Sequence, residues 1–187
     1  MLKITQTPNN VLVQTAKPIN NIDKSIRKLI KDMEQTLVNA HDPEGVGLAA
    51  PQVGISLQLF LIKQTPQSPT LIFINPKIEE YIGYEPHEIK QEQESDKDKR
   101  LSLEGCLSIN NVWGATNRYP AVVLLYQDET GKSHKRKFTG FIATIIQHEV
   151  DHLNGILFTK RVLEQKNPLY KNKKNAKGEI EYEEIQL

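Results

Sequence analysis

Two histidines four residues apart, His148 and His152, have the spacing that lets a single helix hold a metal ion. Four residues is slightly more than one helical turn, so both imidazoles lie on one face and can bind the same ion. Glu149 lies about 100° further round the helix, which makes it a poor third ligand but places it near a water on the ion. A carboxylate there can act as a general base. The stretch Gln147–Gly155 therefore predicts a metal-dependent hydrolase and leaves the substrate open.

Cys106 is the only cysteine in the chain and is a candidate for the third ligand. A zinc- or iron-type site needs one more protein ligand than two histidines supply, and a thiolate can provide it. The alternative role, a small buried hydrophobic side chain, is the usual one for a lone cysteine. A nucleophilic cysteine with a histidine base is disfavoured, because one base would suffice and two histidines are paired here. From the residues alone, ligation and core packing stay equally open for Cys106.

The glycine-rich stretch Gly45–Gly54 lets the backbone approach a ligand or another strand closely. It lacks the Lys-Ser/Thr pair of a P-loop and the third glycine of a dinucleotide-binding fingerprint, so a tight turn is favoured over phosphate binding. Gln52 is the side chain in this stretch that can donate hydrogen bonds to a substrate oxygen.

The pattern of apolar residues predicts the helices and strands that position these residues. An amphipathic helix is predicted from Ile22 to Val38, with Asn21 or Asp23 as its cap. Short apolar runs predict strands at Leu57–Ile62 and Leu71–Ile74.

A hairpin and a second helix follow. The runs Ala121–Tyr126 and Ser133–Phe138 predict two strands joined by a turn at Asp128–Gly131, with the basic second strand at a sheet edge. The motif helix should begin at Thr139 or Gly140 and end at Gly155.

Three residues precede His148 by seven, four and three positions and share its helix face: Phe141, Thr144 and Ile145. They are candidates to wall the space beside the ion with mostly apolar surface. Simple core packing is the equally weighted alternative for Phe141 and Ile145.

Length and composition limit the class of protein. The chain of 187 residues suits one domain, and 38% hydrophobic and 25% charged residues describe a globular, non-membrane protein. A net charge of +1 gives no reason to expect a nucleic-acid site, and no apolar run is long enough to span a membrane. With no secretory segment and one cysteine, a cytoplasmic location is expected. The charged stretch 85–100 is expected to be a loop, and a polar tail begins at about residue 166, with a late strand indicated near Glu179–Tyr182.

Three separated stretches together resemble the signature motifs of peptide deformylases: Gly45–Gln52, Glu104–Ser108 and Gln147–Gly155. They occur in the family's order and cover the middle and C-terminal parts of the chain. The resemblance implies an α+β fold in which antiparallel or mixed β-sheets pack around a central metal-binding helix. It also implies one catalytic domain over residues 1–187.

The resemblance also implies the reaction, which is hydrolytic removal of the formyl group from N-formylmethionine at the start of nascent polypeptides. Cys106 matches the thiolate ligand beside His148 and His152, and Glu149 matches the residue that takes a proton from water and delivers it to the leaving amine. The side chain of Gln52 matches a donor to the formyl oxygen.

Further matches concern the substrate, the ion and partners. The backbone N–H of Leu107 matches a second donor to the formyl oxygen, and Gly47 matches a backbone contact to the substrate. The family uses one divalent ion, typically Fe²⁺ in the cell, with Zn²⁺, Ni²⁺ and Co²⁺ as alternatives. The ribosome near its exit tunnel is a candidate partner. Helical spacing and the motif together give the residues expected to line a methionine slot: Val46, Phe141, Thr144 and Ile145.

Some features depart from the family pattern or leave a choice open. The 85–100 stretch reads as an insertion, and Trp113 stands where some members have a basic residue. Arg118 can pair with Glu104 or with Asp151, and the sequence does not choose.

Two rival functions are weighed against deformylation. A zinc peptidase shares the His-Glu-x-x-His pattern but needs a downstream third ligand, whereas the candidate here, Cys106, lies upstream. A non-catalytic homologue is disfavoured because the ligands, the base and the oxyanion donors are all present.

Overall fold

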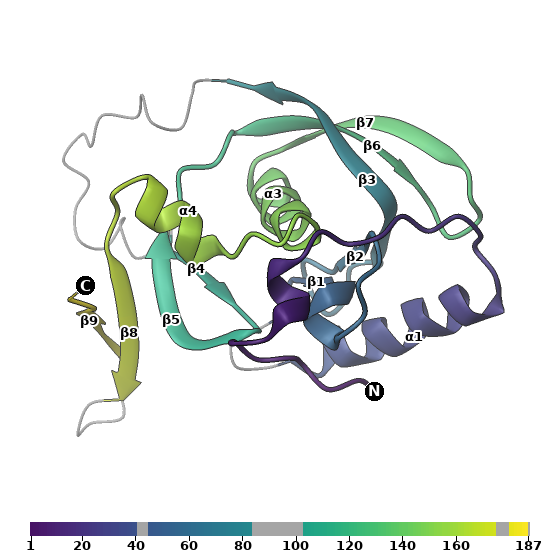
Figure 1. The fold of residues 1–187 in the computed structure, drawn as a ribbon. Helices are drawn as coiled ribbons and strands as arrows, with labels where there is room; N and C mark the ends of the chain where they lie inside the picture. Colours follow the sequence, from purple (N-terminus) through teal and green to yellow (C-terminus); the bar gives the residue numbers. More distant parts are fainter. Residues whose placement is uncertain (41–44, 84–102, 175–179, 187) are drawn as a thin grey trace.

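The computed structural model describes residues 1–40, 45–83, 103–174 and 180–186 (Figure 1). The charged stretch expected to be a loop at residues 85–100 lies outside these residues. Within them, two antiparallel sheets and three α-helices build an α+β fold, as predicted. Every strand pair of the two sheets is antiparallel, so the mixed alternative does not apply to the described strands.

The larger sheet has five strands in the order β1-β2-β3-β6-β7. Their bounds are β1 Gly47–Ala49, β2 Leu59–Ile62, β3 Leu71–Ile82, β6 Ala121–Gln127 and β7 Ser133–Thr139. The predicted hairpin is β6–β7, and the basic strand β7 lies at the sheet edge, as predicted. In its turn, the Asp128 side chain accepts hydrogen bonds from the backbone N–H groups of Thr130 and Lys132.

Strand β2 explains why a short run can be apolar at every position. Side chains alternate between the two faces of a strand, and both faces of β2 are covered. Leu59 and Leu61 join the core beneath helix α1 (Lys24–Val38), whereas Phe60 and Ile62 join the core beneath helix α3 (Phe141–Leu153). The central strands thus place α1 and α3 in separate layers.

Strand β3 runs well beyond the predicted Leu71–Ile74, and two features allow it to continue past Pro76. Proline has no N–H to give to a neighbouring strand, so it is tolerated where pairing is interrupted. The register with β6 shifts between Ile74 and Lys77, and Asn75 adopts a positive φ of 49° at that point. The irregularity accommodates the proline and the strand resumes after it.

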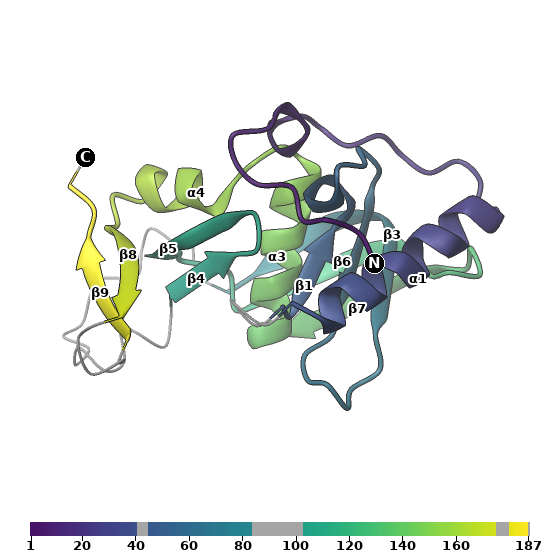
Figure 2. The ribbon, with the colours of Figure 1, turned by 90° about the horizontal axis from the view of Figure 1, so that it is seen from below.

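The smaller sheet has the order β4-β5-β8-β9. Its strands are β4 Leu103–Cys106, β5 Ile109–Ala115, β8 Leu169–Lys174 and β9 Ile180–Glu184. The late strand indicated by the sequence is therefore present as β9, paired with β8. Helix α4 (Phe158–Glu164) packs on one face of this sheet, where Phe158 and Val162 form a core with Leu169 (Figure 2).

Helix α3 occupies the centre of the molecule, between the larger sheet and the strands β4 and β5 (Figures 1 and 2). Two short 3₁₀ helices, Asn10–Val13 and Ala50–Val53, contact each other, and the second also contacts α3 and β1. The predicted capping of α1 is by Asp23, whose side chain accepts from the N–H groups of Ser25 and Ile26. The predicted arrangement of sheets around a central helix is confirmed.

Candidate metal centre

The ends of α3 are set by two glycines. Gly140 precedes the helix with φ 63°, and Gly155 follows it with φ 69°, both in the region that favours glycine. A Cβ on Gly155 would meet the backbone of Val13 at 2.6 Å, so the N-terminal segment passes directly against this turn. The backbone N–H of Ala16 then donates to the carbonyl of Leu153 at 2.8 Å. These contacts hold the helix in one position.

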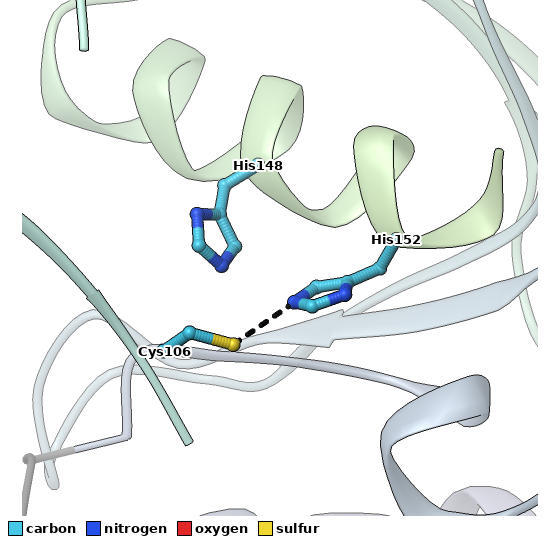
Figure 3. A group of neighbouring side chains, drawn as sticks. All are labelled: Cys106, His148 and His152. Carbon is cyan, nitrogen blue, oxygen red and sulfur yellow. Dashed lines mark hydrogen bonds between the residues drawn. The ribbon is translucent and has the colours of Figure 1, made fainter. Parts of the chain in front are cut away.

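Three side chains from two elements meet beside α3. Cys106 ends strand β4, and His148 and His152 extend toward it from the helix (Figure 3). Their ligand atoms all lie within 4.8 Å of one another, and the Cys106 Sγ is 3.2 Å from the His152 Nε2. A two-residue turn, Leu107 and Ser108, connects Cys106 to β5. The structure thus brings together the three residues predicted as ligands.

The donor set fits a single divalent ion of the zinc or iron type. A thiolate and two imidazoles suit such an ion, and three protein ligands leave a position open for a further group. His148 Nδ1 is 3.0 Å from Glu104 Oε2, so its other nitrogen, Nε2, is the one available as a ligand. Cys106 and His152 are buried, so few other groups could compete for them.

The Glu104 carboxylate belongs to a network of ion pairs. The Arg118 guanidinium contacts both Glu104 oxygens, at 2.9 and 3.0 Å, and reaches the Asp151 Oδ2 at 2.6 Å. Arg161 of α4 makes two further bonds to Asp151, at 2.7 and 3.1 Å. Arg118 therefore pairs with both of the partners between which the sequence did not choose. Through Glu104, this network orients the ring of His148. Hydrogen-bonded partners usually have this role around metal-binding histidines.

The ionisation of the centre suits metal binding. Burial alone would raise the pKa of the Cys106 thiol, but the neighbouring His152 and His148 lower it to about 5. Burial would likewise raise the pKa of Glu104, but Arg118 and His148 hold it well below its usual range. At neutral pH the site thus presents a thiolate, which is the form that binds metals.

Glu149 has a different environment from the other acids. It is 3% exposed, and its Oε2 has no hydrogen-bond partner among the described residues. Burial raises the pKa of its carboxyl to about 7, with the positive charge of His148 and His152 acting in the opposite direction. A carboxyl with a pKa near neutrality can both accept and return a proton, which is what acid–base catalysis requires.

Gln52 faces the three-residue cluster from the 3₁₀ helix Ala50–Val53. Its Oε1 accepts a hydrogen bond from the backbone N–H of Ala49 at 2.8 Å. The orientation of the amide is therefore fixed, and its Nε2 points at the Cys106 Sγ, 3.4 Å away. The glycine-rich stretch is more than the turn favoured from sequence, because it first forms the buried strand β1.

The residues predicted to line a slot lie at different depths. Ile145 is buried and close to Gly47, since a Cβ on Gly47 would meet the Ile145 Cγ2 at 2.9 Å. Thr144 and Val46 are half-buried, and Phe141 is 59% exposed at the start of α3. Core packing is therefore wrong for Phe141, whereas Ile145 does belong to the hydrophobic core.

Comparison with known proteins assigns the chain to a family. Residues 1–168 match the family described as polypeptide deformylase. A peptide deformylase of Synechocystis sp. is 41% identical over 171 residues, which cover 90% of this chain and 81% of the relative. One from Borreliella burgdorferi is 41% identical over 172 residues, covering 91% and 94% of the two chains.

This chain belongs to the peptide deformylase family.

Solved structures agree with this assignment. The crystal structure of the Synechococcus elongatus deformylase in complex with actinonin superposes with a TM-score of 0.71 at 40% identity, covering 88% of this chain and 82% of that one. The Thermotoga maritima deformylase gives 0.70 at 33% identity, covering 87% and 97%. Peptide deformylases are metal-dependent hydrolases, and the cluster of Cys106, His148 and His152 is a site of that kind. That residues 1–187 form one catalytic domain stays a prediction.

Sequence reasoning about this deformylase missed one member of the charge network. The sequence offered Asp151 as one of two possible partners of Arg118, but Arg161 was not singled out as a partner of Asp151. The available signal was weak, because Arg161 lies ten residues along the chain and beyond the end of α3.

Among the described residues, no helix is long and apolar enough to cross a membrane.

Proposed function

We propose that this chain removes the N-formyl group from the N-terminal formylmethionine of nascent polypeptides and releases formate. The observation that carries the proposal is the convergence of five side chains from three parts of the chain. These are Cys106, His148 and His152, with Glu149 and Gln52 beside them. Membership of the deformylase family supports the same reaction.

Cys106, His148 and His152 would hold one divalent ion. When bound, the ion supplies a Lewis acid and lowers the pKa of water toward about 7, so that hydroxide is available at neutral pH. Glu149 takes the proton from the attacking water and delivers it to the nitrogen that leaves. Its burial supports this role, because the carboxyl pKa of about 7 lies near the working pH.

Gln52 and Leu107 would stabilise the negative charge that develops on the formyl oxygen. The Ala49 N–H holds the Gln52 amide with its Nε2 toward the site, so the donor needs no reorganisation during the reaction. The backbone N–H of Leu107 follows Cys106 in the β4–β5 turn and is the second donor. Such donors typically contribute on the order of 3 kcal/mol each.

The methionine side chain would lie beside strand β1, in a slot with Ile145 at its base. The half-buried Val46 and Thr144 would form its sides, and the exposed Phe141 would lie at its mouth. The absence of a side chain on Gly47 leaves room for the Glu149 carboxylate against its backbone. A gradient from buried to exposed apolar surface suits an unbranched, flexible side chain.

We assign Fe²⁺ as the ion in the cell, with Zn²⁺, Ni²⁺ or Co²⁺ as substitutes. Affinity order favours zinc over ferrous iron, so metal supply and oxygen decide the outcome. We place the activity in the cytoplasm, where nascent chains emerge near the ribosomal exit tunnel and where an unpaired thiol stays reduced.

The decisive experiment is anaerobic purification with metal analysis, followed by turnover of a formyl-Met peptide with added Fe²⁺, Ni²⁺, Co²⁺ or Zn²⁺. We expect turnover with Fe²⁺ and its loss in Glu149→Ala with metal content unchanged. Absence of turnover with every ion would contradict the proposal. Cleavage of internal peptide bonds in place of deformylation would favour a peptidase.

A further inference from the structure

One face of the smaller sheet carries aromatic side chains and points away from α4. Gly114 and Leu169 lie opposite each other on β5 and β8, and both contact Val162 of α4. Because side chains alternate along a strand, Trp113 and Tyr170, the neighbouring opposed pair, lie on the other face. The residues opposed across β4–β5 and β8–β9 extend this face, which we call the aromatic face: Gly105, Trp113, Tyr170, Asn172 and Tyr182, with the exposed Glu184 opposite Tyr170 at its rim.

The aromatic face begins one residue before Cys106, at Gly105, whereas the Cys106 side chain packs with Phe158 and Val162 on the α4 face of the sheet. The Trp113 ring lies directly on Gly105, where a Cβ would meet three ring atoms at 2.8 to 3.0 Å. Gly105 immediately precedes Cys106. On its other side, Trp113 contacts the ring of Tyr182 edge-on, with centroids 6.1 Å apart and planes at 90°. Trp113, Asn172 and Tyr182 are each partly exposed, so a bound molecule can reach them.

A hollow of about 250 Å³ borders this surface at Gly105, Trp113 and Asn172. Its lining also includes Cys106 of β4 and the two asparagines Asn110 and Asn111 of β5. An asparagine amide offers two donors and an acceptor, which match the N–H and C=O groups of a peptide backbone. The aromatic rings add large, stiff apolar surfaces, which bind side chains at small entropic cost.

We propose that the aromatic face and this hollow bind the residues that follow formylmethionine in the substrate, and that they favour an aromatic or large aliphatic side chain there. The inference rests on the proposed function, because the occupant is the peptide whose formyl end lies beside Cys106. Asn172 and Tyr182 come after residue 168, where the family match ends. The preference is therefore carried in part by this chain's own C-terminal hairpin.

The test compares three substrates of the metal-loaded enzyme: formyl-Met-Ala-Ala, formyl-Met-Phe-Ala and formyl-Met-Ala-Phe. We expect kcat/KM to be about three- to tenfold higher when phenylalanine occupies one of the two positions, the range that an aromatic contact gives. Tyr182→Ala should reduce this preference to nearly one, and Tyr182→Phe should restore it because the ring is kept.

Glu183→Ala is the matched control. Glu183 is the next residue of β9, on the opposite face of the strand and exposed, where it pairs with Lys173. Its substitution should leave kcat/KM and the preference unchanged. A wild-type enzyme without preference, or a preference that survives Tyr182→Ala, would overturn the inference. Equal losses on all three substrates together with a lower Tm would also overturn it, because Tyr182 would then only hold β9 in place. Failure of the wild type to deformylate any substrate contradicts the proposed function instead.

Discussion

Glu149 lies directly against the backbone of Gly47, so that a methyl group on Gly47 would overlap its carboxylate. The same methyl group would contact the Ile145 Cγ2 at 2.9 Å. Strand β1 thus packs so close to α3 that only glycine fits at position 47. This contact fixes the position of the proposed general base relative to the strand that would hold the substrate.

Gly47→Ala should therefore strongly reduce the rate of deformylation while leaving the metal content of the protein unchanged. The added methyl group displaces the Glu149 carboxylate, and a misplacement of about 1 Å can cost on the order of 100-fold in rate. Steady-state turnover of formyl-Met-Ala-Ala and metal content per chain are the measurements. A variant with lower metal content in proportion to its lower activity would show that Gly47 supports the ligands instead.

Glu149→Gln should make the metal-free protein more stable at alkaline pH. Burial raises the folded-state pKa of Glu149 to about 7 from its usual 4.5, so the folded protein keeps a proton that the unfolded chain loses between these values. Stability therefore falls as pH rises through this window, by roughly 3 kcal/mol in total. Glutamine removes this penalty, and the variant should be more stable by that order at pH 8.

Denaturant unfolding of wild type and Glu149→Gln at pH 8 and pH 4.5 measures this effect. At pH 4.5 the wild-type carboxyl holds its proton in the folded state, so the difference in unfolding free energy should nearly disappear. An equal difference at both values of pH would indicate that packing, and not ionisation, separates the two proteins.

Glu104→Gln should weaken metal binding by about 10- to 100-fold, the usual cost of losing a carboxylate behind a metal-binding histidine. Glu104 contacts the ring of His148 at 3.0 Å and does not belong to the three-residue cluster. Competition with a chromophoric chelator measures the affinity, and excess metal should restore much of the activity. Glu183→Gln, at an exposed carboxylate of β9, is the control that should keep wild-type affinity.

Gln52→Glu tests the proposed oxyanion donor while keeping the acceptor for the Ala49 N–H. The substitution removes the Nε2 donor beside Cys106 and adds a negative charge where the oxyanion would develop. We expect kcat to fall on the order of 100- to 1,000-fold. The fold should persist, which circular dichroism and thermal unfolding can check, and an unchanged kcat would remove Gln52 from the mechanism.

The sequence predicted those features whose signals are local. The pair His148 and His152, the glycine ends of α3 and the turn of the β6–β7 hairpin each depend on spacing within one element. The continuation of β3 past Pro76 was not predicted, because it depends on a register shift against β6, a strand far away in sequence. Deformylase motifs, and not spacing, were needed to choose between ligation and packing for Cys106.

The charge network shows the same limit. Glu104 and Arg118 are 14 residues apart, whereas Arg118 and Asp151 are separated by 33. Only the folded chain brings β4, α3 and α4 together, so the choice between the two partners of Arg118 could not be read from composition or periodicity. In the structure Arg118 pairs with both Glu104 and Asp151.

The three candidate ligands belong to different parts of the architecture, since Cys106 lies in the smaller sheet and the two histidines on the central helix. An ion bound by them would act as a cross-link that closes the chain segment from Cys106 to His148. Binding free energy of this kind is also folding free energy. Chelation should therefore increase local opening between the two layers, visible as faster amide hydrogen exchange in β4 and β5 than in the larger sheet.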